Sequence, residues 1–407
     1  MSRLRDPRCL KGERIPHEVH EERPMNTRTS DNRHVVVVGG GYAGTMAANR
    51  LAATDTAAVT LISPNADFVE RIRLHQLAAG TGGATVGYDT LLHPGIERVI
   101  AAVDRIDVSA RTVLTSTGEI IAYDRVIYAV GSAAGSAPVP GVAEFAHTVS
   151  DLDDATRLAA ALTDAPAGAS VVVVGGGLTG VEMAAEVAEA RDDLGVTLIC
   201  GTGVVPSAGA RGGASVTKRL RRLGVDLIEH TPVGEVTDTK VVLTDGRVIA
   251  ADITVWTAGF AVPDLAARSG LSTDPIGRLM VDADLVGVDD PHVIGAGDAI
   301  TVAGRDLRMS CQSALPLGAQ AANTVRALLD GDTPAPVDQG FAAQCISLGR
   351  TAGTVVATHR DDRPAPILVG GRAGAVVKEQ VCRMTLRWMA GEGRRGGSYS
   401  WTKGPRR

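Results

Sequence analysis

The sequence predicts an α/β protein built around two parallel β-sheets. A strand of β-branched residues that leads through a glycine-rich turn into a helix occurs twice, first at 34–53 and again at 171–190. A second buried strand follows each helix, and both copies end in a similar closing segment. A strand–helix–strand unit of about 30 residues indicates a parallel pair of strands, because its helix returns the chain to the starting edge of the sheet.

Both copies have the same four parts in the same order. The first comprises a strand at 34–38, a turn at 39–44, a helical run at 45–53 and a buried strand at 59–62. The second comprises a strand at 171–174, a turn at 175–180, a helix at 181–190 and a strand at 196–199. Their first glycines, Gly39 and Gly175, are 136 residues apart (175 minus 39).

The segments that close the two copies also correspond. Residues 123–131 end the first copy and 251–259 end the second, and a hairpin with a turn signal precedes each of them, at 116–119 and 244–247. Duplication of the whole unit explains this correspondence. Beyond it we expect a return segment with the motifs 277–282 and 293–298, a helix at 313–329, and a proline-punctuated link at 333–336.

Length and composition indicate a soluble globular enzyme of two or three domains. The 407 residues are 44% hydrophobic and 21% charged, and the formal net charge of −5 argues against a nucleic-acid-binding protein. No apolar run reaches the roughly 18 residues of a membrane span, and the start lacks the apolar stretch of a signal peptide. We therefore expect a cytoplasmic protein. Residues 1–33, with eight basic and six acidic residues, predict a disordered tail, within which Met25 is an alternative start.

Five cysteines stand apart in the sequence, at Cys9, Cys200, Cys311, Cys345 and Cys382. None of them forms a Cys-x-x-Cys pair, and no Cys/His group has the spacing of a zinc site. We therefore expect isolated, reduced thiols and no bound metal.

The glycines of each turn have separate steric tasks. The first allows the tight turn from strand to helix, the second lets the backbone approach a pyrophosphate, and the third lets the helix pack against the strand. The N-terminus of the helix then presents free N–H groups and positive partial charge to the phosphates. These tasks define a Rossmann-like dinucleotide-binding fold, and its context of strand, turn, helix and strand is met twice.

One expected residue is missing from both copies. An acid normally ends the second strand and holds the adenosine ribose hydroxyls, but Ser63 stands there in the first copy and Cys200 in the second. Ser63 can still hydrogen-bond a ribose, whereas a thiol is a poor partner. No arginine directly follows Cys200 to bind a 2′-phosphate, and Arg211 lies further along the chain. The sequence leaves the choice between NADH and NADPH open.

Two such folds followed by the motif at 294–298 resemble the two-dinucleotide-binding-domain flavoproteins of the pyridine nucleotide-disulfide oxidoreductase superfamily. The resemblance covers about residues 34–330. It implies an FAD-binding domain at 34–148 and 265–330, with an NAD(P)H-binding domain at 149–264 inserted into it. A small C-terminal region at 331–407 follows.

The resemblance also implies roles for residues of the matching motifs. Asp298 would bind the ribityl and phosphate side of the flavin, and the alternative for it is a loop or capping acid. Glu182 would lie near the contact between nicotinamide and flavin, and the alternative is an acid favoured by the helix dipole. The implied FAD-binding residues are Gly39, Gly41, Tyr42, Ala43, Gly44, Ser63, Arg73, Ala129, Gly131 and Asp298. The implied residues for the nicotinamide nucleotide are Gly175, Gly177, Gly180 and Gly259.

The redox cysteine pair of the disulfide reductases is absent, since residues 67–76 contain no cysteine. This excludes a disulfide relay, and the resemblance then implies hydride transfer from NAD(P)H to tightly bound FAD and electron transfer to an external acceptor. Arg73 and His75 belong to this segment, which faces the flavin in the family. Either residue can instead be a structural partner of Glu70 or Asp67.

Within the superfamily the sequence resembles type II NADH dehydrogenases and the apoptosis-inducing-factor-like quinone reductases, through residues 175–184 and the spacing to Asp298. In those enzymes the helix after this aspartate carries two glutamines, four residues apart, beside the quinone. Gln312 matches the first glutamine, but Pro316 stands in place of the second. The resemblance implies a quinone as the leading acceptor, with Glu182 and Gln312 as the catalytic candidates, and Pro316 weakens that signal.

Two alternatives stay open. The first is a reductase of a ferredoxin- or rubredoxin-type carrier or of a biosynthetic partner, steered by the basic residues Arg219, Arg221 and Arg222. The second is a slowly turning, nucleotide-sensing flavoprotein similar to apoptosis-inducing factor, which the absent ribose acids favour.

The C-terminal region is basic, with nine basic and two acidic residues at 371–407. The spacing +4, +3, +4 predicts one apolar helix face, with Lys378 away from it, from Val377, Val381, Met384 and Trp388. The helix either packs on the enzyme's own core or in a homodimer contact, or it lies on the inner face of the membrane and lets the enzyme meet a membrane quinone.

Overall fold

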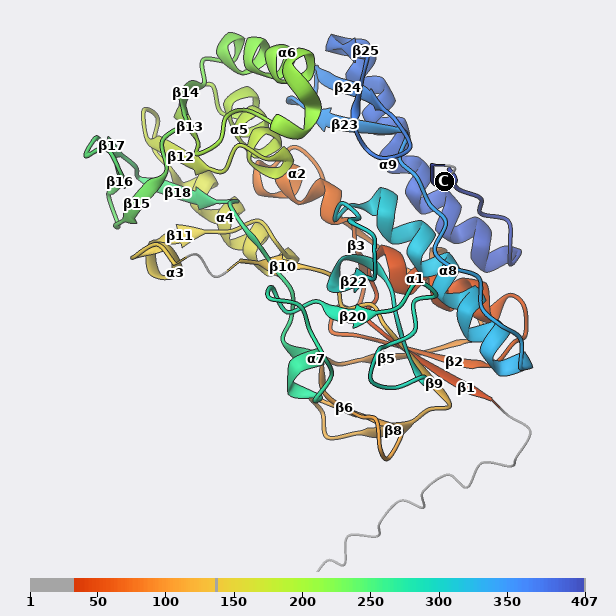
Figure 1. The fold of residues 1–407 in the computed structure, drawn as a ribbon. Helices are drawn as coiled ribbons and strands as arrows, with labels where there is room; N and C mark the ends of the chain where they lie inside the picture. The colour runs from red at the N-terminus through yellow and green to blue at the C-terminus, as the bar shows by residue number, and fades with distance from the viewer. Residues whose placement is uncertain (1–32, 136–137, 406–407) are drawn as a thin grey trace, which may run out of the picture. The chain divides into compact units, whose positions relative to one another are not determined.

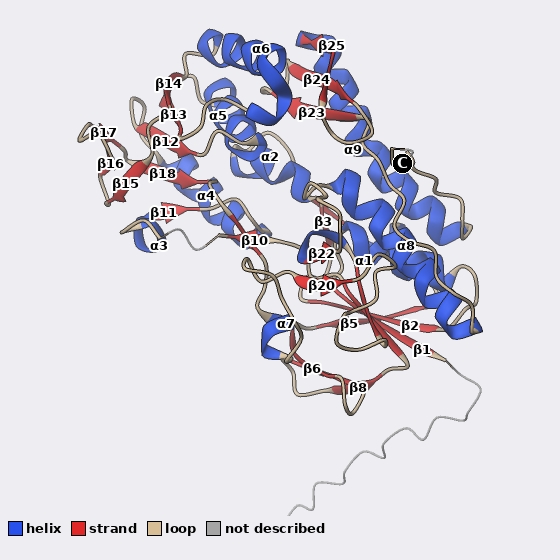
Figure 2. Ribbon diagram, in the orientation of Figure 1, coloured by secondary structure: helices blue, strands red, loops and turns tan. Residues whose placement is uncertain are grey.

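Two five-stranded parallel sheets organise the computed structural model, which describes residues 33–135 and 138–405 (Figures 1 and 2). The predicted α/β class with parallel sheets is confirmed. The tail predicted at 1–33 and the alternative start at Met25 lie outside the described residues, except for Arg33.

The first sheet takes strands from two separated parts of the chain. Its order is β21-β9-β1-β2-β5, and all four pairings are parallel. Because β21 follows the strands of the second sheet in the sequence, the second fold interrupts the first. The strands are β1 (His34–Val38), β2 (Ala58–Ser63), β5 (Ile96–Ile100), β9 (Arg125–Tyr128) and β21 (Val293–Gly295).

The second sheet repeats this arrangement in the order β11-β18-β12-β13-β14, again with parallel pairings only. Its strands are β11 (Ala146–His147), β12 (Ser170–Val174), β13 (Gly195–Cys200), β14 (Asp226–Glu229) and β18 (Ile253–Trp256). Strands β12, β13 and β18 occupy the positions that β1, β2 and β9 have in the first sheet. Because the strands are parallel, their carboxyl ends lie at one edge of each sheet. The glycine-rich turn therefore lies at the same edge as the ends of the second strand and the closing strand.

A three-stranded antiparallel meander accompanies each sheet, where the sequence predicts hairpins. Gly118 and Gly246 occupy the turns with φ of +83° and +88°, a conformation that favours glycine. The strands are β6 (Val103–Asp107), β7 (Thr112–Thr115) and β8 (Ile120–Ala122), then β15 (Val233–Val236), β16 (Lys240–Leu243) and β17 (Val248–Ala250).

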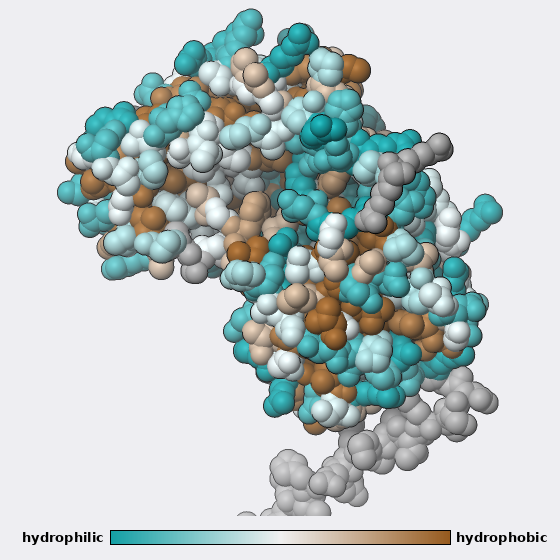
Figure 3. All heavy atoms as spheres, viewed as in Figure 1, coloured by the Kyte–Doolittle hydropathy of each residue, from teal (hydrophilic) through white to brown (hydrophobic). Residues whose placement is uncertain are grey.

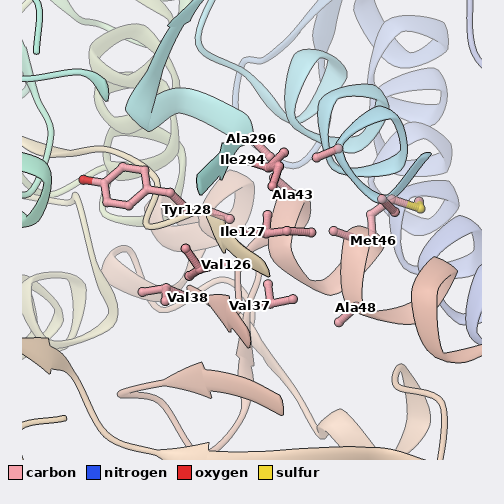
Figure 4. Close-up of a cluster of buried hydrophobic side chains, with 14 of the residues drawn as sticks. Val37, Val38, Ala43, Met46, Ala48, Val126, Ile127, Tyr128, Ile294 and Ala296 are labelled. Atoms are coloured by element: carbon pink, nitrogen blue, oxygen red, sulfur yellow. The ribbon is translucent and has the colours of Figure 1, made fainter. Parts of the chain in front are cut away.

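Helix α1 (Tyr42–Ala52) is buried along its whole length between the first sheet and α8 (Cys311–Asp330). Figure 4 shows Ala43 and Met46 of this helix in the cluster that they form with Ile127 and Ile294 of the sheet. Gly318 of α8 has no space for a side chain, because the carbonyl group of Ala43 lies where its Cβ would stand. This close approach places the first turn of α1 against the N-terminal half of α8.

The C-terminal region forms an antiparallel sheet of β23 (Ala343–Ser347), β24 (Gly353–Thr358) and β25 (Pro364–Gly370), followed by α9 (Gly371–Arg394). The predicted helix is confirmed, and it packs on α1 and on this sheet. The predicted orientation of Lys378 is wrong. Its side chain is only 13% exposed, in line with buried Gly374 and Cys382, whereas the residue Val377 is 38% exposed.

The remaining elements connect these layers. The helices are α2 (Leu74–Ala78), α3 (Val142–Phe145), α4 (Leu152–Asp164), α5 (Leu178–Ala190), α6 (Gly209–Arg222) and α7 (Leu265–Arg268). The single 3-10 turns are η1 (Arg71–Arg73), η2 (Tyr88–Thr90), η3 (Pro206–Ala208) and η4 (Gly297–Ala299). Short strands are β3 (Phe68–Val69), β4 (Thr85–Val86), β10 (Ala133–Ala134), β19 (Phe260–Ala261), β20 (Leu279–Val281) and β22 (Ile300–Val302). Among the described helices, none combines the length and apolar character needed to cross a bilayer.

Candidate active site

The glycine turn after β1 has the geometry that its sequence predicts. Gly39 adopts φ of +107°, and any Cβ there would collide with the carbonyl group of Ala129 at the end of β9. A Cβ on Gly44 would collide with the carbonyl oxygen of Gly39, so the helix approaches the strand closely. Gly41, in contrast, faces open space with no protein atom within 4 Å of a Cβ position. The open side of the turn is therefore the side on which a phosphate can approach.

The turn after β12 repeats this geometry. Gly175 has φ of +128° beside Thr257, and a Cβ on Gly180 would collide with the carbonyl oxygen of Gly175. Gly177 is open, as Gly41 is in the first copy. At the end of β18, Gly259 has φ of +86° and open space around it.

Asp298, in η4, is partly buried next to the first sheet. Its Oδ2 accepts a hydrogen bond of 3.0 Å from Ser132, and its Oδ1 is buried with no partner among the described residues. Burial raises the pKa of this carboxyl, and Arg71 partly opposes that shift. A small cavity beside it is lined also by Gly297, Arg308 and Ser313. An unpartnered buried acceptor is costly for the protein unless a ligand donates to it.

Arg71, rather than Arg73, is the arginine at this carboxylate. Its Nη1 donates to the carbonyl oxygen of Ser132 at 2.7 Å and lies 3.6 Å from the Cβ position of Gly131. The guanidinium of Arg73 instead pairs with Glu379 of α9 at 3.0 Å and with Glu70 at 3.3 Å. The structural alternative considered for Arg73 matches this arrangement, so Arg71 replaces it as the candidate on the flavin side.

The end of β2 is covered by an aromatic residue. The hydroxyl group of Tyr88 donates to the carbonyl oxygen of Gly40 at 2.7 Å and also lies beside Ser63. Phe68 packs edge-on between Tyr88 and Tyr42, with ring centroids 6.1 Å and 5.1 Å apart. Ser63 is buried under this group, while the hydroxyl of Tyr42 is buried and has no hydrogen-bond partner in the part of the chain that the structure describes.

A chain of buried charged groups connects α5 to α9. Lys378 Nζ lies 3.1 Å from Glu182 Oε1 and also donates to the carbonyl oxygen of Cys345 at 3.2 Å. Burial lowers the pKa of Lys378, but Glu182 outweighs burial and holds this pKa above its usual value. Burial raises the pKa of Glu182, but Lys378 and His75 outweigh it and hold that pKa below its usual value. The pair is therefore charged.

His75 extends this chain from α2. Its Nδ1 lies 3.9 Å from Glu182 and its Nε2 lies 3.9 Å from Glu186, longer than a hydrogen bond in both cases. Burial lowers the pKa of His75 to about 4, so the ring is neutral at neutral pH. Burial also raises the pKa of Glu186, which accepts a hydrogen bond from Thr81 and lies 3.8 Å from the partly exposed Arg350. The chain thus extends from Lys378, whose side chain is 13% exposed, through the fully buried Glu186 to the partly exposed Arg350.

Three thiols that stand far apart in the sequence surround Lys378. Cys311, Cys345 and Cys382 are all within its electrostatic reach, and burial raises the pKa of each thiol. Cys311 is the first residue of α8 and is also within reach of Asp298. The sequence alone suggests isolated cysteines, because these three come from a helix start, a strand and a second helix. Raised pKa values indicate unreactive thiols that pack as small apolar groups.

Gln312 lies at the start of α8, where its Oε1 accepts a hydrogen bond of 3.2 Å from Arg308. Pro316, one turn later, is accommodated within the helix. Gln320, a further turn along, is buried and fixed by bonds to the Pro316 carbonyl oxygen and the Asp338 amide. Of the two glutamines on this face of α8, Gln320 is therefore engaged within the protein, and Gln312 near the helix start is the candidate to contact an acceptor.

The two glycine turns and the buried carboxylate define an oxidoreductase that holds two nucleotides in adjacent folds. Comparison with known proteins gives the family. Residues 33–321 match the family described as pyridine nucleotide-disulphide oxidoreductase, and the chain belongs to it. An NADH dehydrogenase-like protein of Mycobacterium tuberculosis is 31% identical over 387 residues, which cover 83% of this chain and 96% of the relative. A type II NADH:quinone oxidoreductase of Staphylococcus epidermidis is 26% identical over 404 residues, with 89% and 97% covered.

Solved structures agree on the fold. The sulfide:quinone oxidoreductase of Aquifex aeolicus superposes with a TM-score of 0.75 at 18% identity, covering 89% of this chain and 92% of its own. NDH2 of Plasmodium falciparum, solved with NADH, gives 0.74 at 15% identity, covering 89% and 97%.

This protein is therefore a flavoprotein oxidoreductase of this family, with FAD and NAD(P)H as its nucleotides, and it is similar to relatives described as NADH dehydrogenase-like. The residues present fit FAD, because the first turn is open at Gly41 and Asp298 has a buried acceptor oxygen that no other described residue hydrogen-bonds. When bound, FAD supplies two-electron chemistry between the nicotinamide and the acceptor.

Proposed function

We propose that this protein is an NAD(P)H:quinone oxidoreductase whose acceptor takes up protons as well as electrons. The chain of Lys378, Glu182, His75 and Glu186 is the observation that supports this proposal. The relatives described as NADH:quinone oxidoreductases are consistent with it. In this proposal Glu182 is a proton-carrying residue rather than only a neighbour of the nicotinamide.

Proton balance distinguishes the candidate acceptors. A quinone that becomes a quinol gains two electrons and two protons, and a hydride supplies both electrons and only one of the protons. The second proton comes from water. An iron–sulfur carrier takes up electrons alone and requires no buried proton donor. A structure that keeps an ammonium, a neutral imidazole and two carboxylates in one buried series is suited to the first class of acceptor.

The direction of transfer follows from the charges. Lys378 is charged and can donate a proton. Glu182, a carboxylate at rest, can then recharge it across 3.1 Å after it has itself received a proton from His75. Neutral His75 can accept a proton from the Glu186 side and release one toward Glu182, provided that each 3.9 Å gap closes by a small side-chain movement. Thr81 and Arg350 mark the other end, where Glu186 is itself fully buried and Arg350, 3.8 Å away, is partly exposed, so in this proposal protons enter beside Arg350.

The basic surface that would serve a carrier protein is partly engaged. Arg219 of α6 pairs with Glu189 and donates to the carbonyl oxygen of Leu348, so it is not free to bind a partner. Arg221 and Arg222 remain exposed. A carrier protein is therefore the second candidate acceptor.

Replacing Lys378 tests the proposal. We expect Lys378→Met to lower the rate of reduction of a soluble short-chain quinone about a hundredfold, the usual effect of losing a proton donor. Reduction of ferricyanide, which takes one electron and no proton, should change by less than about threefold because it needs no such donor. Both rates are measured per bound flavin, so a variant that binds less FAD is corrected for that loss.

Lys240→Met is the matched control, since Lys240 is exposed on β16 in the second fold. Lys378→Arg should restore part of the quinone rate. A parallel fall of the quinone and ferricyanide rates in Lys378→Met would contradict the proposal. Rapid reduction of an iron–sulfur carrier together with no reduction of any quinone would support the second candidate.

A further inference from the structure

The second fold lacks the usual ribose acid at the end of β13. Cys200 occupies that position and is fully buried. Burial, with a smaller contribution from Glu229, raises the pKa of its thiol to about 12. A neutral buried thiol accepts hydrogen bonds weakly, so Cys200 is a poor ligand for ribose hydroxyls.

The neighbouring strand β14 supplies a carboxylate at the same level. Glu229 ends β14 and pairs in register with Cys200 of β13. Its Oε1 accepts a hydrogen bond of 3.3 Å from the amide of Val204 and lies 3.8 Å from the Cβ position of Gly203. The side chain therefore reaches from its own strand over the loop that follows Cys200.

That loop is in direct contact with the glycine turn of the same fold. The amide of Val205 donates to the carbonyl oxygen of Gly176 at 2.8 Å. A Cβ on Gly176 would collide with the carbonyl oxygen of Gly203. The carboxylate, the loop and the turn are therefore in contact with one another, on the side of β13 where the fold places the adenosine ribose of a bound dinucleotide.

The charge of Glu229 is not neutralised by a basic partner. Within the described part of the chain, no lysine, arginine or histidine forms an ion pair with it. Arg247 is held by Asp245 and by the hydroxyl group of Thr231. Arg211 donates to the carbonyl oxygen of Pro366, so it is not directed at a 2′-phosphate.

We propose that Glu229 binds the adenosine ribose hydroxyls of NADH and excludes NADPH, in place of the acid that is absent from position 200. This rests on the proposed function only in that a nicotinamide nucleotide is the electron donor. A carboxylate can accept hydrogen bonds from both ribose hydroxyls, and it repels the negative charge of a 2′-phosphate.

The first fold has no carboxylate in the position that corresponds to Glu229, so this carboxylate is specific to the second, nicotinamide-nucleotide-binding fold. In the first fold the end of β2 is Ser63, and the residue opposite it on β5 is Ile100, which is 56% exposed. An isoleucine cannot accept a hydrogen bond. The two folds, although duplicated in outline, therefore differ in the group that stands beside the second strand.

Equilibrium binding of NADH and NADPH to the flavin-loaded protein, whose flavin has first been reduced so that no hydride transfer can occur, tests the proposal when it is followed by nucleotide fluorescence. We expect the unmodified protein to bind NADH at least about tenfold more tightly than NADPH, the usual effect of a charge-assisted hydrogen bond. Glu229→Gln should weaken NADH binding about tenfold and leave NADPH binding nearly unchanged. The ratio of the NADPH and NADH dissociation constants should therefore fall toward one.

Glu235→Gln removes an equal charge from exposed β15 of the same fold and should alter neither affinity. Equal binding of the two nucleotides by the unmodified protein, or an unchanged ratio in Glu229→Gln, would overturn the assignment. If Glu229→Gln does not fold, the ratio in the unmodified protein and in Glu229→Asp decides.

The outcome is separable from that of the proposed function. NADH-selective binding together with no quinone reduction would remove the quinone acceptor and leave Glu229 in its role. Rapid quinone reduction together with equally tight binding of NADH and NADPH would support the quinone acceptor and remove the role of Glu229. If neither nucleotide binds, both proposals fail.

Discussion

His75 shows how much a single buried residue determines in this protein. It is 4% exposed, its Nε2 has no hydrogen-bond partner in the described structure, and the nearest oxygen of Glu186 is 3.9 Å away. Its neutral form is the one that the protein interior accepts. This preference must appear in the stability of the protein, because the unfolded chain places no such limit on the ring.

The sign of the effect follows from the two pKa values. The pKa of His75 falls from its usual 6.5 to about 4 on folding, so between these values the unfolded chain binds more protons than the folded one. Stability should therefore decline as the pH falls from 6.5 toward 4. We expect His75→Gln to remove on the order of 2 kcal/mol of this decline at pH 5.

The measurement is the free energy of unfolding in urea at pH 7 and at pH 5. His359→Gln is the control, because His359 lies on the exposed surface without a side-chain hydrogen bond among the described residues. An equal difference between the two pH values in the unmodified protein and in His75→Gln would contradict the argument.

At the scale of elements, the two glycine-rich turns separate folding from ligand binding. The protein itself needs Gly44, since a Cβ there would collide with the Gly39 carbonyl oxygen. Gly41 has φ of −75° and an empty space beside it, so the polypeptide can accept an alanine there. Only an approaching pyrophosphate needs that space.

We therefore expect opposite outcomes from two alanine substitutions in one turn. Gly41→Ala should leave the unfolding free energy of the flavin-free protein within about 0.5 kcal/mol but strongly reduce bound FAD, measured by visible flavin absorbance. Gly44→Ala should destabilise the flavin-free protein itself by about 2 kcal/mol or more. Full flavin content in Gly41→Ala would show that phosphate does not approach this side of the turn.

The contrast between the turns and the polar chain shows what the sequence could predict. The turns are local, so strand, glycines and helix predict them within about ten residues. The polar chain joins α2, α5 and α9, and Arg73 pairs with Glu379 across 306 residues. The packed side of α9 is marked by Gly374, Lys378 and Cys382, which no apolar periodicity would indicate. The apolar spacing that begins at Val377 and Val381 is the stronger sequence signal, and it leads the prediction to the more exposed face of α9.

At the scale of the whole molecule, the proposed quinone acceptor raises the question of how the protein would meet a molecule dissolved in a bilayer. Exposed apolar residues gather where β25 joins α9, and they are Ile367, Val369, Val376 and Val377. Figure 3 shows apolar surface in this part of the view, near the position of β25 in Figure 1. Arg372 is exposed beside them. Apolar side chains next to a basic residue are typical of a surface that binds anionic lipid.

We expect sedimentation with anionic vesicles to recover the protein at low salt and to recover less at high salt, because the attraction is partly electrostatic. Replacing Ile367 and Val376 together by aspartate should abolish recovery. The control replaces Ile120 and Val248 by aspartate, since both are equally apolar and exposed on the two meanders. Absence of binding at low salt would contradict a membrane-binding role for this surface, and the enzyme would then have to meet its acceptor in solution.

The ion pair between Arg50 of α1 and Glu392 of α9, at 2.5 Å across 342 residues, has a consequence for biosynthesis. Glu392 is fully buried and also accepts hydrogen bonds from the amides of Gly397 and Tyr399. Arg50 lies in α1, the first of the described helices, and its carboxylate partner is translated 342 residues later. A nascent chain therefore holds an unpaired cation at the first sheet and lacks Lys378 altogether. In the proposed mechanism, proton transfer through Lys378 can begin only after translation has passed α9, so a chain that has not yet reached this helix is an inactive precursor.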